Sequence, residues 1–480
     1  MAKSLKMKAF IGTALLASAS MASADTLREA LVKAYQTNPT LTGARAGQRV
    51  IDENVPIARA HILPSANANA TLNQTIDNYP GEVPGRRIQL GVNGAVPLYS
   101  GGGLRNQVRS AEARVAAGRA NLLGTESDVF VATVTAYMDV LRDQAIVGLN
   151  QSQVKLLQVN LEATKDRFEV GDLTRTDVAQ SEARLALADS NLQSAEAQLI
   201  ASRERYVQIV GDEPDNLETP PPLPNMPTTV GQAVETALAD NPDLHAANEG
   251  RKAAALDVKV SQSQRMPRVS GVANVQGGHY LGSLNSPLRP ERDSSVAVGV
   301  QATMPLFSGG ALSAQNRQSQ ARLSQSQEQI IEIERSIIAQ TRSAFARWRA
   351  ANGVIESTEI AVKANKLALE GVRAENSVGT RTILDILDAQ QELLNSEVRL
   401  ETAKRDAYVA GFQLLAVMGR AQYASLGLDG GAMYDPTLTY KRYEKTIWDW
   451  KDEPDPVPQA TRTVDTIPQT PALPDKPNKK

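Results

Sequence analysis

Two acidic side chains are spaced so that they can act together. Asp385 and Asp388 lie three positions apart in a segment predicted to be helical, so their carboxylates share one face of the helix. Neighbouring carboxylates attract cations, repel anions and raise one another's pKa values. The chemistry that this spacing offers is therefore electrostatic selection of cations.

A local structural role is the alternative for each of these residues. Asp385 stands three positions after a threonine, the spacing of a helix capping box, and Asp177 has the same position after its own threonine. A cap therefore explains Asp385 as well as a selectivity role does. Asp388 has no such counterpart, because Gln180 occupies the matching position, and a solvated helix face is its alternative.

Residues for catalysis are not assembled in this sequence. Its three histidines lie in unrelated contexts, it has no glycine-lysine phosphate loop, and no nucleophile or acid-base cluster stands out. Without cysteine the chain forms no disulfide, and a formal net charge of −2 gives no reason to expect nucleic-acid binding. We therefore predict a protein that is not an enzyme and has no cofactor and no metal.

The elements that must position the two aspartates occur twice. Asn38-Pro39-Thr40-Leu41 recurs 203 positions later as Asn241-Pro242-Asp243-Leu244, and a Pro-Leu-(Tyr/Phe)-Ser-Gly-Gly junction recurs after 208 positions. Each copy has a helical lead-in, two strands with period-two alternation and a long span without proline. The strand-helix junctions carry the same residues in both copies: Pro97, Gly101 and Gly102, then Pro305, Gly309 and Gly310.

The alternating segments predict strands with one apolar face. In residues 87–100 and 295–308, aliphatic side chains alternate with small or polar ones, and a weaker strand precedes each, over 65–79 and 268–281. Strands of this length and pattern suit a transmembrane barrel with lipid outside and water inside. The alternative is a pair of soluble hairpins on a helical core.

The proline-free spans, 98–213 and 306–435, predict long helices. Apolar residues recur every seven positions in the second span, which is typical of a wall of coiled coil, with a soluble helical hairpin as the alternative. Each span is divided once, at Gly171 or at Gly379, where we expect the tip turns. A helix from 104 to 170 would be about 100 Å long.

Four strands in one chain cannot close a barrel in a bilayer. Such strands must leave no unpaired edge, and the smallest membrane barrels have eight. Chains must therefore share their strands. Two, three or four chains satisfy this requirement, so strand closure alone leaves the number of chains open.

We predict the following divisions of the chain: a signal peptide over 1–24, with a membrane anchor as the poorer alternative; a first repeat over 25–219, with a strand hairpin at 65–100 and a helical hairpin at 103–211; a proline-rich linker over 220–227; a second repeat over 228–428, with hairpins at 268–308 and 311–420; and an aromatic segment with a disordered proline-rich tail over 429–480. The aromatic segment either packs around the outside of the helices or forms a local cluster.

The duplicated units, the junction motif and the turn from Val378 to Asp388 resemble the TolC family of outer-membrane channel-tunnels, over roughly residues 25–428. The resemblance implies a mainly α fold with a transmembrane β part. It consists of a coiled-coil α-helical tunnel in the periplasm, joined to a twelve-stranded β-barrel that a homotrimer shares in the outer-membrane lipid. It also implies that a periplasmic adaptor and an inner-membrane transporter are partners, and that drugs or unfolded secreted proteins are the cargo.

The same resemblance implies roles for residues at the tip. Arg381 would reach Thr176 and Asp177 to hold the helices closed, and rings of Asp385 and Asp388 would form the narrowest gate. The chain departs from the family pattern at Asn376, where relatives have a tyrosine. The rival classes are a soluble periplasmic coiled-coil adaptor and an enzyme on a helical scaffold.

Overall fold

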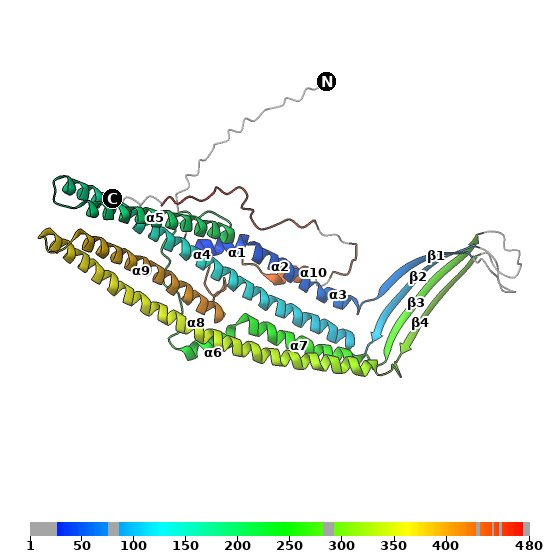
Figure 1. The fold of residues 1–480 in the computed structure, drawn as a ribbon. Helices are drawn as coiled ribbons and strands as arrows, with labels where there is room; N and C mark the ends of the chain where they lie inside the picture. The colour runs from blue at the N-terminus through cyan, green and yellow to red at the C-terminus, as the bar shows by residue number, and fades with distance from the viewer. Residues whose placement is uncertain are drawn as a thin grey trace, which may run out of the picture.

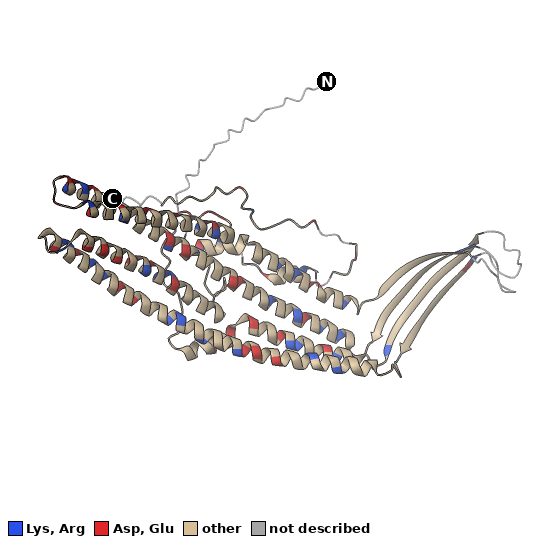
Figure 2. Cartoon of the chain, in the orientation of Figure 1, with Lys and Arg blue, Asp and Glu red and all other residues tan. Residues whose placement is uncertain are grey.

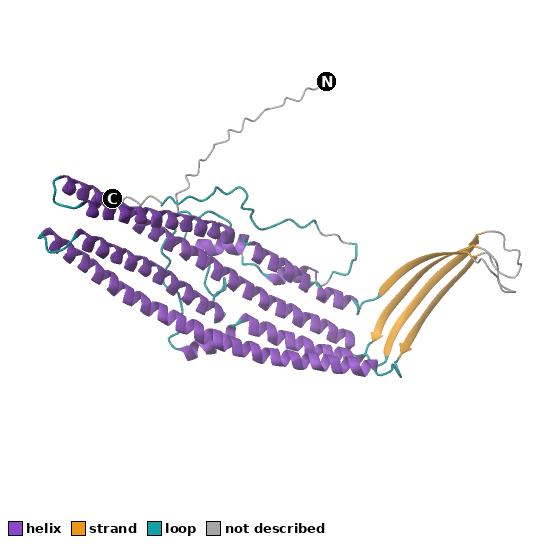
Figure 3. Cartoon of the chain, viewed as in Figure 1, coloured by secondary structure: helices purple, strands orange, loops and turns teal. Residues whose placement is uncertain are grey.

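The computed structural model describes residues 26–74, 86–281, 292–428, 433–443, 446–450 and 454–473. The molecule is elongated, with a four-stranded sheet at one end and long helices running away from it (Figure 1). Figure 3 shows that strand and helix occupy separate parts of the molecule. The predicted signal peptide lies outside the described residues.

Each repeat contributes short lead-in helices and one pair of long helices. α4 and α8 have 67 residues each, which corresponds to about 100 Å. In the described part of the chain, no helix has an apolar stretch long enough to cross a membrane. The helices are α1 (Leu27–Thr37), α2 (Pro39–Asp52), α3 (Asn54–Ala60), α4 (Gly103–Glu169), α5 (Arg175–Val210), α6 (Val230–Asp240), α7 (Pro242–Ser263), α8 (Ala311–Ser377), α9 (Ile383–Val417) and α10 (Pro436–Tyr443).

The sheet is antiparallel and follows chain order, β1 (Ser65–Gln74), β2 (Arg86–Tyr99), β3 (Arg268–Leu281) and β4 (Arg292–Thr303). Both hairpins have the same register. Ser65 pairs with Ala95 in the first, and Arg268 pairs with Thr303 in the second, which are shifts of 203 and 208 positions. The duplication seen in the sequence therefore extends to individual residue pairs.

The two faces of the sheet differ in chemistry. One face carries exposed aliphatic side chains, among them Leu90 and Val298, which are 56% and 82% exposed. The other face carries amides, and Asn93 Nδ2 donates to Asn69 Oδ1 at 3.0 Å. Figure 2 shows that charged residues are frequent along the helices and sparse on the strands. Because the apolar face is uncovered, it needs a partner other than water.

The last strand is shorter than the alternation predicts, because it ends at Thr303 and not at Ser308. In the first repeat, the matching residues of β2 stay in the sheet because they pair with β3, as Val96 does with Gly271. β4 is an edge strand, and β3 begins at Arg268, which pairs with Thr303. Residues 304–308 thus extend beyond the first residue of β3, the strand with which β4 pairs in the same chain.

Two asparagines join the lead-in helices to the returning long helices. Asn38 caps α2 and donates through Nδ2 to the Ile209 carbonyl of α5 at 2.8 Å. Asn241 caps α7 and donates to the Val417 carbonyl of α9 at 2.9 Å. Both asparagines are buried. The repeated Asn-Pro motif is therefore the same structural joint used twice.

The main hydrophobic core surrounds the middle of α4, where α1, α5 and α9 meet it. Its largest fully buried side chains include Phe130, Tyr137 and Tyr206. Tyr137 also donates its hydroxyl to the Glu218 carbonyl at 2.7 Å, which anchors the segment that leads into the linker. The core therefore lies between the sheet and the tips and holds both repeats together.

The C-terminal segment differs from the expected disorder. Tyr434 packs beside this core, with its backbone N–H bonded to the Tyr35 hydroxyl at 3.0 Å, whereas Trp448 and Trp450 are exposed. Residues 454–473 run in extended form to α5, where Arg203 and two glutamates bind the backbone. Composition predicts disorder here because it contains no information about these partners, which lie some 260 positions away.

We predict that Gly419→Ala destabilises the protein more than Gly427→Ala. Both glycines have positive φ, +71° and +59°, which costs an L residue about 1–2 kcal/mol. A Cβ at position 419 would also lie 2.2 Å from the Asp240 carbonyl oxygen, whereas one at position 427 would meet nothing within 4 Å. Thermal unfolding followed by circular dichroism in detergent measures the difference, and equal midpoints would contradict a tight joint at Gly419.

Candidate functional site

The tips of the two helical hairpins turn at matching glycines. Gly171 and Gly379 have φ values of +82° and +80°, in the left-handed region that favours glycine. A Cβ at either position would meet nothing within 4 Å, so conformation and not space requires glycine here. Both turns are followed at once by a new helix.

Both predicted capping boxes are present. Asp385 accepts hydrogen bonds from the Thr382 N–H at 2.9 Å and from its hydroxyl at 2.7 Å, and Asp177 does the same with Thr174. The Thr382 hydroxyl and backbone N–H hold the pKa of Asp385 below its usual value. The backbone N–H and hydroxyl of Thr174 lower the pKa of Asp177 in the same way. Asp385 is therefore an ionised carboxylate that already has a structural task.

Asp388 has a charged partner that the sequence did not reveal. Its carboxylate accepts from Arg184, which reaches it from α5 in the other repeat. The side chains of Asp388 and Arg184 are 57% and 31% exposed, so water still reaches the pair. The acidic charge of Asp388 is thus partly balanced within one chain.

Arg381 is engaged on its own hairpin. Its Nε donates to Glu375 Oε2 at 2.8 Å, and its Nη1 lies 3.7 Å from Asp385 Oδ1. Asn376, at the position where the family pattern has tyrosine, donates through Nδ2 to the Arg381 carbonyl at 2.7 Å. These contacts close the second turn on itself. The latch from Arg381 to Thr176 and Asp177 stays a prediction.

The first tip also has an ion pair across its turn, but its arginine precedes the turn, whereas Arg381 follows the second turn. Arg167 donates from Nη2 to Asp172 across the turn at 2.8 Å. Position 167 matches position 375, so the copies place an arginine and a glutamate at the same point. A residue-by-residue comparison of the two copies could have predicted both ion pairs from the sequence.

Apolar packing attaches the second hairpin to the first near the tips. Leu387 of α9 is 2% exposed and packs with Val154 and Leu157 of α4. Asn160 of α4 donates to the Gln390 side chain of α9 at 3.3 Å. The beginning of α9, which carries both candidate gate residues, is therefore held against α4.

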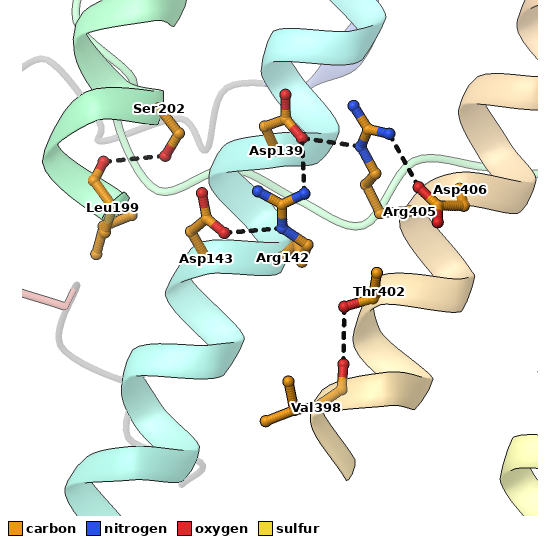
Figure 4. A network of polar contacts seen from close by, with 9 residues as sticks. All are labelled: Asp139, Arg142, Asp143, Leu199, Ser202, Val398, Thr402, Arg405 and Asp406. Atoms are coloured by element: carbon orange, nitrogen blue, oxygen red, sulfur yellow. Dashed lines mark hydrogen bonds and ion pairs between the residues drawn. The ribbon is translucent and has the colours of Figure 1, made fainter. Parts of the chain in front are cut away.

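An ion network joins α4 to α9 farther from the tip (Figure 4). Asp139 accepts from Arg405 Nε at 2.8 Å and lies 3.1 Å from Arg142 Nη1, and Arg142 also binds Asp143. Arg142 and Arg405 are only about one-fifth exposed. The positions that match Asp139 and Arg405 in the other copy hold Arg347 and Ala197. The duplication therefore does not repeat this ion network.

The chain matches a known protein family along most of its length. The family model described as outer membrane efflux protein matches residues 30–212 and 233–420. The outer membrane efflux protein BepC of Brucella suis biovar 1 is 32% identical over 439 residues, which cover 90% of this chain and 92% of BepC. The outer membrane protein TolC of Vibrio cholerae is 27% identical, with coverage of 85% and 94%.

A solved structure shares the fold. The CmeC outer membrane channel of Campylobacter jejuni aligns with a TM-score of 0.72 at 16% identity, and the alignment covers 92% of this chain and 98% of CmeC. The mainly helical architecture with a four-stranded sheet is therefore that of known channel structures.

We predict that both capping boxes weaken in acid. A carboxyl group with a lowered folded pKa stabilises the fold above its unfolded value of about 3.9, and this stabilisation is lost as the pH falls through the folded pKa. Amides at the start of α5 and α9 should therefore exchange faster below about pH 4, after correction for the intrinsic pH dependence of exchange. Hydrogen-exchange mass spectrometry measures this, and Thr382→Ala should remove the pH dependence at α9 alone. Corrected rates that are the same at low and neutral pH would exclude the capping role.

Proposed function

Because this chain belongs to the outer membrane efflux protein family, we propose that it works as a homotrimer, with a twelve-stranded barrel in the outer membrane and a helical tunnel in the periplasm. The protein is an outer-membrane exit duct. In our proposal it receives cargo from an inner-membrane transporter through a periplasmic adaptor. The transporter supplies the energy, and this chain does no catalysis. The signal peptide over 1–24 and the division into two repeats with a linker are part of the same proposal.

One observation carries the proposal: the sheet has two open edges, an uncovered apolar face and an amide-bearing face. Lipid allows no unpaired backbone group, so a sheet of this kind must join other strands before it can lie in a bilayer. A soluble adaptor would have no use for the aliphatic face. The described residues contain no group of side chains that could hold a metal ion.

The chain provides a template for the seam between subunits. Within one chain, β2 of the first hairpin pairs with β3 of the second, as Val96 does with Gly271. Moving β2 onto β4 by 208 positions and β3 onto β1 by 203 places Gln301 opposite Thr71 of the neighbouring subunit, and Val300 opposite its Leu72. Amide-face residues then meet amide-face residues, and aliphatic residues meet aliphatic ones, which a one-residue slip would destroy.

The same template provides partners for residues that are exposed in one chain. Phe307, which is 91% exposed, matches Tyr99, which pairs with Val269. Its partner between subunits would be Ala66 of the neighbouring chain. On the helices, Val50 is 71% exposed, whereas the matching Ala253 of α7 is buried against α4. We propose that α8 of the next subunit covers Val50 as α4 covers Ala253.

We predict that Gln301→Cys combined with Thr71→Cys forms a disulfide between subunits. Residues directly opposite in an antiparallel pair have Cα atoms about 4.5–5.5 Å apart, within the range for a disulfide. The natural chain has no cysteine, so no other disulfide competes. Non-reducing electrophoresis should show dimers and trimers.

Gln301→Cys with Asn73→Cys is the matched control, because it tests a slip of two residues that keeps the same faces together. A stronger crosslink in this control would overturn the register but keep the trimer. Absence of any crosslinked trimer in both variants would count against the shared barrel.

We also propose that Asp385 and Asp388 form the periplasmic gate, with Arg381, Thr176 and Asp177 as its latch. Three chains would bring six carboxylates together at the tip. Within each chain Asp385 is already ionised by its cap, and Asp388 is partly balanced by Arg184. The free acidic charge at the gate would then come mainly from Asp385.

We predict that Asp385→Asn with Asp388→Asn abolishes block of the channel by a trivalent cation in planar lipid bilayers, because removing the carboxylates removes the cation site. Thr382→Ala is the matched control, since it weakens the cap of α9 but keeps both carboxylates and should keep the block. Of the two single variants, Asp385→Asn should have the larger effect. Block that persists in the double variant would exclude the carboxylates from the gate.

A further inference from the structure

The C-terminal tail is seated on α5 by a small number of contacts. Arg203 donates from Nη1 to the Thr470 carbonyl and from Nη2 to the Ala472 carbonyl, the latter at 2.8 Å. Two tail N–H groups are bound in turn by glutamates, Gln469 by Glu204 at 3.0 Å and Ile467 by Glu213 at 2.9 Å. Side chains from this region of the helices thus satisfy both the donors and the acceptors of an extended backbone.

The anchor points of the tail are well defined. Arg203 is only 7% exposed, although it is a surface-type residue with no acidic partner in these contacts. Leu473 packs onto the main hydrophobic core and lies over Gly148 of α4, where a Cβ would be 3.7 Å from its Cδ1. Other tail side chains, such as Val464 and Ile467, are 77% and 70% exposed. The tail is therefore held mainly by its backbone carbonyls and by one leucine.

The tail also shares two short motifs with the segment that links the repeats. Asp212-Glu213-Pro214-Asp215 opens the segment that leads into the linker, and Asp452-Glu453-Pro454-Asp455 recurs at the start of the tail. Farther along, Leu223-Pro224-Asn225-Met226-Pro227 is matched by Leu473-Pro474-Asp475-Lys476-Pro477. Both segments thus carry an Asp-Glu-Pro-Asp motif followed by a Leu-Pro-x-x-Pro motif.

The linker contacts the corresponding position of the other repeat. Gly411 of α9 matches Arg203 of α5, and a Cβ at Gly411 would lie 2.6 Å from Leu223 Cδ1. The Tyr408 hydroxyl donates to the Pro221 carbonyl at 3.2 Å. The same position on each returning helix therefore receives a proline-rich segment.

We propose that the surface around Arg203 and Gly148 is a binding site for an extended peptide containing a Leu-Pro pair, and that the tail is its resident ligand, bound to its own chain and exchangeable. Arg203 recognises the carbonyls of Thr470 and Ala472, which flank Pro471, and a proline at this point has no N–H group that could compete for partners. The few anchors allow the tail to leave the site without unfolding of either helix. This inference rests on contacts within one chain and does not depend on the number of subunits.

The test uses the full-length protein with Gly148→Cys as its only cysteine. The tail should protect this thiol, so labelling by a maleimide reagent should be slow. Arg203→Ala and Leu473→Ala should each speed labelling several-fold, whereas Arg205→Ala, which removes an exposed arginine from the same helix, should leave the rate unchanged. Adding a synthetic peptide of residues 464–477 to the Leu473→Ala variant should restore protection, and the same peptide with alanine in place of the leucine should not.

Each result bears directly on the proposal. Labelling that is insensitive to Arg203→Ala and Leu473→Ala would contradict the claim that these residues hold the tail over Gly148. Faster labelling in Leu473→Ala without protection by the added peptide would overturn an exchangeable binding site. In a separate variant, Gly148→Cys with Leu473→Cys, oxidation should leave the electrophoretic mass unchanged, and a ladder of crosslinked chains would overturn binding of the tail to its own chain.

Discussion

The pairing of backbone N–H and C=O groups at the edges of a sheet is the constraint on which this structure depends. In water an open edge costs little, because solvent provides partners, but in lipid each unpaired group costs several kcal/mol. β1 and β4 are the two edges of the described sheet, and Leu90 and Val298 show that its aliphatic face is uncovered. In the proposed trimer, neighbouring chains would supply the strands that pair with these two edges.

Duplication meets that requirement with one set of interactions used repeatedly. The Asn38 and Asn241 joints, the two capping boxes and the equal hairpin registers show that each repeat solves the same local problems with matched residues. In the proposed trimer, a contact between repeats within the chain would then have a counterpart between chains. Positions where the copies differ, such as Asp388 and Gln180, are free of this shared task and are available for function.

Local features could be predicted from the sequence, because their causes are local. The alternation of Leu90 and Val92 with polar residues, the helix-starting threonines and Gly379 all act within a few positions along the chain. Long-range features could not. The partner of Asp388 is Arg184, 204 positions earlier, and nothing near either residue indicates the pair. The early end of β4 depends on the length of β3, its pairing strand in the same chain. The contact of the tail with Arg203 depends on residues that are 267 positions apart.

The differences between the copies also make the seams of the tunnel wall unequal. Between α4 and α9, Asp139 is shared by Arg142 and Arg405 at sites about one-fifth exposed, where screening by water is weak and separation of the helices would break the Asp139–Arg405 ion pair. At the matching contact between α8 and α5 of a neighbouring subunit, Arg347 would lie opposite Ala197, whose side chain cannot form an ion pair. In the proposed trimer, relative movement of helices would therefore cost least between subunits. A tunnel that opens at its tip would keep each chain's α4 and α9 together and would separate along the seams between chains.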